Sequence, residues 1–514
     1  MLAGLLLPAC GGPDLGVDRV VVISLDTLRV DHLGAYNPDV ETTPHLDAIA
    51  AEGVRFENAY APVPLTLPSH TSLFTGRSPL QTRVMANGDQ VPEDIPALAE
   101  IFRDHGFATG AFVSLGVLND NFGLARGFDA YNLDLGDTGR WYRSADEVFE
   151  PAWAWVEEHR DDPFLLWVHY SDAHEPYASK TFPPDLAVEL DGEVLGEYRL
   201  SLKENLDVAF ELPPGRHTLS FRSLIPEPTR RERGLWLEVR NATEVQPWLF
   251  ESEGLPAGEV PIHPALDLEL LNSGADPVAV TVAFKGRWKH PPPGVVRREY
   301  ALEVAYVDRY VGELRNRMAA AGLDERTLWL VVSDHGEGLY RHNALGHAAA
   351  VWEDQLRIAW FMSGPGLPAG EVYSGLPARM EDVAPTLLGH LGMKVPKGVD
   401  GIDLHGCWSG EGCPRIPPRW SFGINDKGVL TGVAGYDWPY KWMWFRGRDR
   451  VFGLDIDPWE SRRGTIAHDA PADVLSLGRQ AERYRQVVTE GLERRSRREP
   501  TPEEIEMLRN LGYL

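Results

Sequence analysis

The chain has 514 residues, with 50 Lys or Arg against 76 Asp or Glu, so its formal net charge is -26. Hydrophobic residues make up 43% and charged residues 25%, a globular composition that excludes fibrous and wholly disordered proteins. The acidic balance argues against nucleic acid as a partner, because phosphate binding needs clustered Lys and Arg. The length predicts roughly two to four domains.

The first ten residues are apolar and end in the segment Leu7–Cys10. The stretch is too short to span a bilayer, which needs about 20 apolar residues. It resembles the end of a bacterial lipoprotein signal with Cys10 as the lipidated residue, and the alternative is a frayed hydrophobic terminus. We expect residues 1–16 to be a lipoprotein signal and linker, and the protein to reach the membrane only through its lipid anchor.

The two remaining cysteines, Cys407 and Cys413, lie six residues apart in a Gly-rich loop. A disulfide that closes this loop suits an exported protein, because disulfides persist in oxidising compartments. Lipid on Cys10 and this bridge would leave no free thiol. Together these features indicate a lipid-anchored protein in the periplasm or at the cell surface.

Short apolar runs that end in polar residues predict a buried parallel sheet, because they are continuous rather than alternating. These runs are Val20–Leu25 before Asp26, Phe164–Val168 before His169, and Leu328–Val332 before Ser333 and Asp334. Helical patterns lie between them, at residues 44–52, 93–105 and 299–321. The alternation predicts a doubly wound α/β domain with helices on both faces, in which ligands bind beyond the carboxyl ends of the strands.

Residues 181–292 break this pattern with short strand-like segments separated by Gly and Pro turns, which predicts an inserted β-sandwich. A C-terminal part rich in Trp and Tyr is expected to form a small α+β subdomain. The predicted parts are the signal and linker 1–16, the catalytic domain 17–180 and 293–405, the β-rich insertion 181–292, and the C-terminal subdomain and helical tail 406–514.

Four candidate metal ligands stand out: Asp26, Thr66, Asp334 and His335. Pro68 and Ser69 are expected to open a helix beside Thr66, where the helix dipole favours an anion. A divalent metal at the hydroxyl would make Thr66 an oxyanion nucleophile. Two carboxylates, an imidazole and an alkoxide favour Zn²⁺ or Mn²⁺, with Mg²⁺ and Ca²⁺ as alternatives.

Several further motifs follow one another along the chain: Leu25–Gly34, Thr42–Asp47 with Gly53–Phe56, Thr66–Gly76, Arg126–Asp129, His169–Tyr177, Tyr300–Asp308, Ser333–Glu337 with Gly346, His347 and Glu353, and Leu508–Leu514. In combination and in this order they resemble the sulfatases of the alkaline phosphatase superfamily, and the resemblance covers nearly the whole chain outside the β-rich insertion.

The resemblance implies that Asp26, Asp334 and His335 bind the metal and that Thr66 is both ligand and nucleophile. His174 and His347 would face the transferring group or the leaving oxygen, one of them as general acid. Asn87 would donate a hydrogen bond to an anionic oxygen of the substrate. We interpret His169 as structural and His70 as a residue behind the site. A second metal remains open, and would require Asp172, His174 and His347 to converge.

The chain departs from the sulfatase pattern at the nucleophile. Sulfatases of this family convert a Cys or Ser to formylglycine, and Thr66 cannot follow that route. The usual Arg four residues later is His70, and the second Asp of the opening pair is Thr27. A Thr ester of phosphate or phosphonate can be cleaved by activated water, whereas a Thr sulfate is harder to clear, so Thr66 favours phosphate diesters or phosphonate esters over sulfate esters.

The leading hypothesis is therefore a metal-dependent hydrolase of anionic esters that works through a covalent Thr66 intermediate, with a glycan or a lipid head group as the substrate class. One alternative is a transferase of phosphoethanolamine or glycerol phosphate; relatives of that kind usually carry transmembrane helices, and no later stretch of this sequence is long and apolar enough. A second alternative is a surface protein that binds glycans and has a vestigial site. The oligomeric state is left open.

Overall fold

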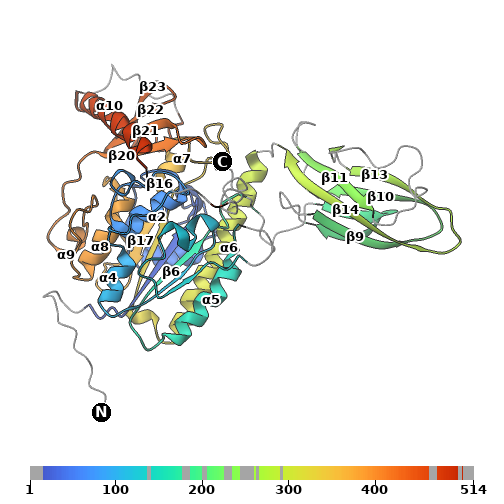
Figure 1. The fold of residues 1–514 in the computed structure, drawn as a ribbon, viewed down its shortest axis with the longest axis horizontal. Helices are drawn as coiled ribbons and strands as arrows, with labels where there is room; N and C mark the ends of the chain where they lie inside the picture. The colour runs from blue at the N-terminus through green and yellow to red at the C-terminus, as the bar shows by residue number, and fades with distance from the viewer. Residues whose placement is uncertain are drawn as a thin grey trace, which may run out of the picture. The chain divides into compact units, whose positions relative to one another are not determined.

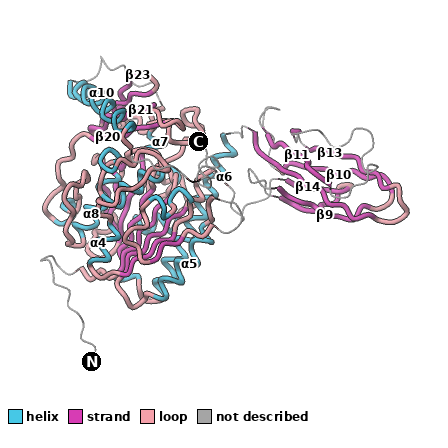
Figure 2. The backbone as a smooth tube through the Cα atoms, viewed as in Figure 1, coloured by secondary structure: helices cyan, strands magenta, loops and turns pink. Residues whose placement is uncertain are grey.

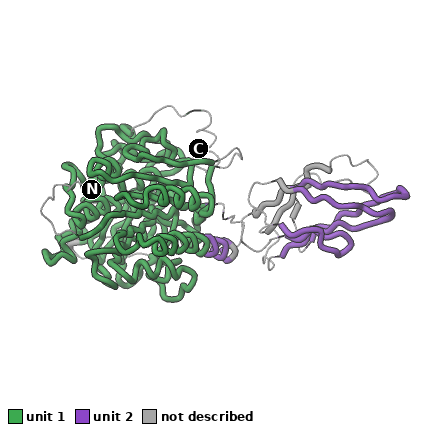
Figure 3. Tube along the Cα trace, turned by 90° about the horizontal axis from the view of Figure 1, so that it is seen from below, with its two compact units in different colours: residues 1–174, 304–514 green, residues 175–303 purple. Residues whose placement is uncertain are grey.

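The computed structural model describes residues 15–135, 141–175, 177, 186–198, 205–224, 234–242, 260–261, 265–289, 293–461, 472–495 and 501. The predicted lipidation site Cys10 lies outside these residues. The chain forms two compact units (Figure 3): unit 1 comprises residues 1–174 and 304–514, and unit 2 comprises residues 175–303. Among the described residues, no helix has both the length and the apolar character that crossing a membrane requires.

Unit 1 is built on one eight-stranded sheet (Figure 1). Strand β17 runs antiparallel to both of its neighbours, and the other pairs are parallel. The predicted mostly parallel sheet is thus confirmed. Its strands, in spatial order, are β18 (Glu371–Tyr373), β2 (Gly53–Phe56), β17 (Trp360–Ser363), β15 (Thr327–Ser333), β1 (Arg19–Leu25), β6 (Phe164–Tyr170), β4 (Ala108–Phe112) and β5 (Ala130–Asn132).

Helices cover both faces of this sheet, with α5 and α6 on one side and α2, α4 and α8 on the other (Figures 1 and 2). The helices among the described residues are α1 (Pro44–Ala51), α2 (Thr66–Thr75), α3 (Pro79–Thr82), α4 (Leu98–Asp104), α5 (Ala145–Glu158), α6 (Pro293–Ala320), α7 (Glu353–Leu356), α8 (Val383–His390), α9 (Gly406–Ser409) and α10 (Ala472–Glu493), with short 3-10 turns at Val30–His32, Gly116–Leu118, Asp120–Phe122, Asp324–Arg326 and Met380–Asp382. The end of the predicted helical tail, residues 502–514, lies outside the described residues.

The three central strands are buried along their whole length, as their continuous apolar runs predict. Strand β1 pairs in parallel with β15 and β6, in a register that sets Leu25 opposite Ser333 and Tyr170. The carboxyl ends of all three strands therefore stop at the same level. This register brings the residues that follow them to one edge of the sheet.

Unit 2 consists of two four-stranded sheets, in which the strands pair antiparallel. Buried side chains from both sheets form one shared core, so the unit is the predicted β-sandwich. Its strands are β7 (Leu186–Leu190), β8 (Glu193–Tyr198), β9 (Asn205–Leu212), β10 (Gly215–Ser223), β11 (Gly234–Ala242), β12 (Val260–Pro261), β13 (Ala265–Asn272) and β14 (Val278–Lys289).

Two smaller sheets complete unit 1. One joins β3 (Ala59–Tyr60), β16 (Arg357–Ile358) and β19 (Ala378–Arg379), and the other is the antiparallel meander β20 (Arg419–Ile424), β21 (Leu430–Asp437), β22 (Tyr440–Phe445) and β23 (Arg448–Gly453). Helix α10 packs against β21 and β22, giving the expected small α+β part.

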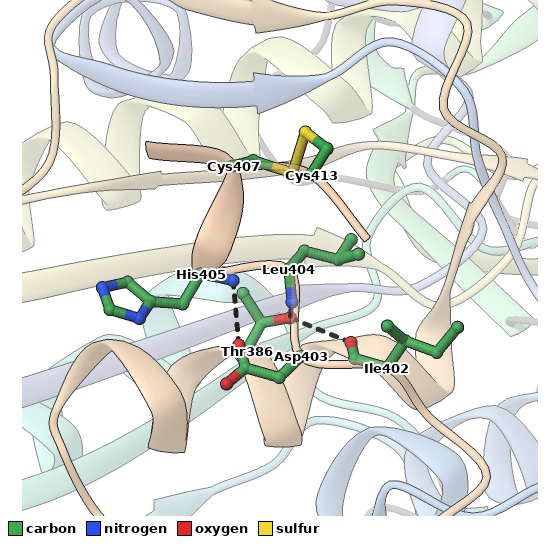
Figure 4. Close-up of a disulfide and its surroundings, with 7 residues drawn as sticks. All are labelled: Thr386, Ile402, Asp403, Leu404, His405, Cys407 and Cys413. Atoms are coloured by element: carbon green, nitrogen blue, oxygen red, sulfur yellow. Dashed lines mark hydrogen bonds between the residues drawn. A yellow bond between two sulfur atoms is a disulfide. The ribbon is translucent and has the colours of Figure 1, made fainter. Parts of the chain in front are cut away.

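A disulfide joins Cys407 and Cys413 beside the turn that follows α8 (Figure 4). The turn is tied to α8 through the hydroxyl of Thr386, which accepts a hydrogen bond of 3.0 Å from the Leu404 amide and donates one of 3.3 Å to the Ile402 carbonyl. The bridge therefore closes a loop that is already anchored to the core.

Candidate active site

The loops after β1 and β15 bring three predicted metal ligands together. Asp26 follows β1, and Asp334 and His335 follow β15. Each offers one ligand atom, these atoms all lie within 4.8 Å of one another, and all three residues are buried. Backbone bonds fix the two loops, because the Asp26 amide donates to the Tyr170 carbonyl at 2.9 Å and the Asp334 amide to the Leu25 carbonyl at 3.3 Å. The parallel register thus produces the cluster.

The atoms of this site that could bind a metal ion are largely without hydrogen-bond partners in the described chain. Both carboxylate oxygens of Asp26, Oδ2 of Asp334, Nε2 of His335 and Oγ1 of Thr66 are buried without a hydrogen-bond partner among the described residues. Buried polar atoms in native proteins are nearly always satisfied, so a convergence of orphaned acceptors points to a bound cation. Two carboxylates, an imidazole and a hydroxyl fit a divalent metal ion.

The site's charges support the same interpretation. Burial works against ionisation of Asp26, yet the nearby imidazoles of His169, His174 and His335 hold its pKa below the ordinary value. Burial and the neighbouring Asp26 raise the pKa of Asp334 well above its usual range. Burial lowers the pKa of His335 to about 3, so its ring is neutral and keeps a lone pair for a ligand. Without a cation, the negative charges of Asp26 and Asp334 repel each other.

Thr27 holds Asp334 in place instead of serving as a ligand. Its amide donates to Asp334 Oδ1 at 3.0 Å, and its hydroxyl lies 2.8 Å from the carbonyl oxygens of Asp26 and Ala173. Its φ of 56° places a β-branched residue in the left-handed region, which costs free energy and is typical of functional sites. The Thr found where the family has a second Asp thus has a structural role.

Helix α2 begins at Thr66, and the expected opening of the helix by Pro68 and Ser69 is wrong. Ser69 lies inside the helix and donates to the Val63 carbonyl at 3.0 Å. Asn87 supplies the missing cap, because its Oδ1 accepts the Leu67 amide at 2.9 Å. Its Nδ2 is buried and has no partner in the described chain, so it is a spare donor beside the start of α2.

His70 lies directly behind Thr66. Its Nδ1 donates to the Thr66 carbonyl at 2.8 Å, and its Nε2 accepts from the Ser24 hydroxyl at 3.0 Å, which itself accepts from Trp167 Nε1 at 2.8 Å. These bonds need a neutral ring, and burial lowers the pKa of His70 to about 3. His70 therefore anchors the first turn of α2 and brings no positive charge to the site.

His169 has a larger role than the sequence indicated. Its Nδ1 lies 2.9 Å from the Ser114 hydroxyl and 3.4 Å from the Ser114 amide, which can only donate, so Nδ1 is an acceptor and the proton sits on Nε2. Nε2 is 3.5 Å from Asp26 Oδ2, beyond good hydrogen-bond distance but facing that carboxylate. His169, held by Ser114, thus turns Nε2 towards Asp26, a placement that the apolar run before His169 did not reveal.

His174 and His347 come together from distant parts of the chain, with ring centroids 5.2 Å apart, and the His347 ring is 4.5 Å from that of His335. Glu337 accompanies them, its Oε2 lying 3.2 Å from His347 Nδ1. Asp172 is engaged through one oxygen only, since its Oδ1 accepts the Ala145 amide at the start of α5 at 3.0 Å and its Oδ2 has no partner among the described residues.

The comparisons with known proteins agree with this fold. A family model described as Sulfatase matches residues 18–393. The ulvan-active sulfatase of Formosa agariphila is 24% identical over 75% of this chain and 64% of its own length, and the choline-sulfatase of Rhizobium meliloti is 24% identical over 90% and 85%. The solved phosphonate monoester hydrolase of Agrobacterium radiobacter superposes with a TM-score of 0.60 at 19% identity, covering 92% of this chain and 96% of that one.

The chain belongs to the sulfatase family, because the family model spans most of its length. This family has the alkaline-phosphatase-like α/β fold that the eight-stranded sheet displays. Membership makes the chain a hydrolase of the class that acts on sulfuric or phosphoric ester bonds. The aligned region spans 64% of the ulvan-active sulfatase, so that protein's substrate does not transfer with the family.

Proposed function

We propose that this chain is a metal-dependent hydrolase of anionic esters that attacks its substrate with Thr66 and passes through a covalent Thr66 ester. The observation that carries the proposal is the Thr66 hydroxyl, which is fully buried at the first turn of α2 and has no hydrogen-bond partner in the described chain. His70 links the first turn of α2 to the cluster, because its Nδ1 lies 2.8 Å from the Thr66 carbonyl and 3.8 Å from Asp334 Oδ2. A buried hydroxyl at a helix N-terminus that favours anions suits a nucleophile.

Asp26, Thr66, Asp334 and His335 would hold one divalent ion, with Zn²⁺ or Mn²⁺ favoured and Mg²⁺ or Ca²⁺ as alternatives. When bound, such an ion lowers the pKa of the hydroxyl and draws charge from the ester. A second ion would need Asp172, whose Oδ1 accepts the Ala145 amide at the start of α5 and whose Oδ2 has no partner among the described residues, so metal analysis decides between one ion and two.

The protein's own residues would divide the reaction into two displacements. The Thr66 hydroxyl gives up its proton to solvent, and its oxygen forms a bond to phosphorus or sulfur. The bond to the leaving oxygen breaks as His174 or His347 donates a proton to it. Asn87 Nδ2 would donate to a non-bridging oxygen of the group being transferred. Water then attacks the Thr66 ester, the bond to Thr66 breaks, and the oxygen of Thr66 regains a proton.

Thr66 favours phosphorus esters over sulfate esters. A Thr ester of phosphate or phosphonate is cleaved by attack of water at phosphorus, whereas attack at sulfur in a Thr sulfate is harder. The chain is similar in structure to a phosphonate monoester hydrolase and in sequence to ulvan-active and choline sulfatases. The test therefore includes both phosphorus esters and sulfate esters. The substrate would carry its ester on a glycan or a lipid head group.

Paired turnover tests the proposal. Protein lacking residues 1–16 is assayed with an aryl sulfate, an aryl phosphate diester and an aryl phosphonate, each with Zn²⁺, Mn²⁺, Mg²⁺ or Ca²⁺, with Thr66→Ala as the control. We expect phosphorus ester turnover that disappears in Thr66→Ala, together with one tightly held ion per chain. Turnover that survives Thr66→Ala would rule out the nucleophile, and a protein that holds no ion and turns over nothing would instead be the vestigial glycan-binding alternative.

We further propose that the protein is exported and attached to lipid through Cys10. The Cys407–Cys413 disulfide supports export, because such bonds persist in oxidising compartments. Labelling cells with a radioactive fatty acid should mark the wild-type protein and leave Cys10→Ala unlabelled. Equal labelling of the two proteins would contradict the anchor without affecting the proposed chemistry.

A further inference from the structure

The segment that carries His347 contains a strained turn. Residues 346–352 form neither helix nor strand. The Ala349 amide donates to the His347 carbonyl at 3.1 Å, across Ala348, whose φ is 78°. A bond of this span around a central residue with positive φ makes the rare and strained kind of γ-turn. A residue with a Cβ keeps such a backbone only when its surroundings hold it there.

The C-terminal meander β20–β23 holds this turn. The Ile424 amide of β20 donates to the Ala348 carbonyl at 3.0 Å. The Thr431 hydroxyl of β21 donates to the Ala349 carbonyl. Gly423 allows β20 to come this close, because a Cβ there would lie 3.1 Å from the Ala348 oxygen. Two successive carbonyls of the turn are thus fixed by strands that lie far along the chain.

Thr431 reaches the turn because it is the extra residue of a β-bulge. Gly423 pairs with Gly432, and Ile424 pairs with Leu430, so Thr431 stands opposite no residue of β20. Its hydroxyl also lies 3.0 Å from the Gly423 carbonyl. Bulges redirect a side chain and are over-represented next to active sites. The bulge here directs a hydroxyl at the segment that carries His347.

Other side chains hold the two ends of the same segment. Lys441 of β22 is fully buried, and its Nζ donates to the Val351 carbonyl at 2.7 Å and contacts Glu353 Oε1 at 2.9 Å. At the other end, Nε2 of Gln355 donates to the Gly346 carbonyl at 3.2 Å. The ends are therefore fixed independently of the bulge, which holds the middle.

The backbone of this turn determines where the His347 ring stands, with its centroid 4.5 Å from that of His335 and 5.2 Å from that of His174. We propose that Thr431 is a positioning residue, whose hydroxyl holds the strained turn at Ala348 and so sets the His347 ring in the candidate active site. The inference rests on the proposed function and deepens it, because His347 is one of the two candidate proton donors. It gives the C-terminal meander a part in catalysis.

The test is Thr431→Val, which keeps the branched shape of the side chain and removes the hydroxyl. A reacting group that is misplaced by about 1 Å can cost about 10²-fold in rate. We expect kcat to fall by about 10- to 100-fold on the ester that the wild type turns over best, with KM within about twofold of the wild-type value. Thr431→Ser keeps the hydroxyl and should recover most of kcat.

Two double variants connect the effect to His347 and to the turn. Thr431→Val/His347→Gln should lose no more kcat than His347→Gln alone, because changes that act through one group are not additive. Thr431→Val/Ala348→Gly should regain part of kcat, because Gly adopts a positive φ without steric cost. A residue that only stabilised the meander would show neither result.

Thr327→Val is the matched control. Its hydroxyl donates to the Leu323 carbonyl at 2.7 Å at the start of β15, the end of the strand that lies away from the candidate active site. Its removal should lower the melting temperature, as in Thr431→Val, and leave kcat unchanged.

An unchanged kcat in Thr431→Val would overturn the inference while the proposed function stands. A further loss in Thr431→Val/His347→Gln, or no recovery with Ala348→Gly, would also overturn it. A fully active His347→Gln would refute the role of His347 and the inference together. Turnover that survives Thr66→Ala would refute the nucleophile, which is a separate result.

Discussion

Asp26 and Asp382 are both completely buried in unit 1, yet their surroundings are opposite. Asp382 accepts the Ile402 amide at 2.7 Å and the Arg379 amide at 2.9 Å, and both of its oxygens contact Arg419 Nη2, at 2.9 and 3.0 Å. Asp26 accepts no hydrogen bond from the described residues. One carboxylate is fully satisfied by the fold, and the other is left with its bonding capacity unused.

A buried polar group that the fold satisfies has a structural role, whereas one that the fold leaves unsatisfied points to a bound ligand. An unsatisfied buried polar group costs about 1–3 kcal/mol, and more when it is charged, so folding alone does not favour the arrangement around Asp26. The cost is concentrated where β1 and β15 end, together with Asp334, His335 and Thr66. A ligand that binds there offsets it. Asp382 and Arg419 should matter for stability, and Asp26 for chemistry.

Asp26→Asn should give the largest effect on function. Removal of the charge is expected to abolish tight metal binding and to lower turnover by at least about 10³-fold, the scale of charge stabilisation at a reacting centre. The free energy of unfolding of the metal-free protein should fall only slightly, because Asp26 accepts no hydrogen bond from the described residues. Metal analysis, steady-state kinetics and urea unfolding measure the three quantities. A large loss of stability without the metal would contradict the comparison.

Arg419→Met should lower stability and leave activity unchanged. It leaves the Asp382 charge buried without its cation, which is expected to lower the free energy of unfolding by about 3–5 kcal/mol. The kcat of the folded protein should not change, because neither residue belongs to the candidate active site. The double variant Arg419→Met/Asp382→Asn should recover part of the loss. Equal destabilisation in both proteins would mean that the charge pair is not the cause.

His390 gives a third contrast, since both of its ring nitrogens are engaged. Nε2 donates to the Pro365 carbonyl at 3.0 Å, and Nδ1 accepts from Trp408 Nε1 at 3.3 Å, so the ring must stay neutral. Burial lowers the pKa of His390 to about 4 in the folded state, against 6.5 as the ordinary value.

The unfolded chain therefore binds a proton below pH 6.5 that the folded chain does not. Stability from this residue is complete above that pH and is lost as the pH falls towards 4, by up to about 3 kcal/mol. Denaturant unfolding between pH 4 and pH 7 should show a shallower slope in His390→Gln than in the wild type. The exposed His105→Gln is the control and should keep the wild-type slope.

His169→Gln should produce the smallest of these effects. Residues that orient a metal ligand contribute about 10- to 100-fold to metal affinity, and His169 faces Asp26 without joining the ligands. We expect the dissociation constant for the metal to rise by that factor while the folded structure is kept. Calorimetric titration of the metal-free protein measures it, and an unchanged affinity would return His169 to a purely structural role.

The sequence predicts the frame of the site well because the signals are local. Continuous apolar runs mark β1, β6 and β15, and in a parallel sheet the residues that follow such runs must share one edge. Proline chemistry could have corrected one boundary. The helix expected over 93–105 begins only at Leu98, because Pro96 restrains the residue before it.

The remaining features depend on contacts between distant residues. The start of α2 at Thr66 relies on Asn87, twenty positions beyond the Leu67 amide that it caps, and no local pattern reports such a contact. The pairing of Glu337 with His347 needs the intervening loop to fold back. His169 resembles any strand-end residue until Ser114 and Asp26 are seen on either side of its ring.

The central claim is that the orphaned Thr66 hydroxyl is the nucleophile, and the most direct measurement is a search for its ester. The wild-type protein with metal is mixed with an aryl phosphonate or phosphate diester, quenched in acid within the first turnover and digested for mass spectrometry. The account predicts an added phosphonyl or phosphoryl group on Thr66, which is absent in Thr66→Ala. Turnover without any adduct on Thr66, or an adduct on a different residue, would contradict it.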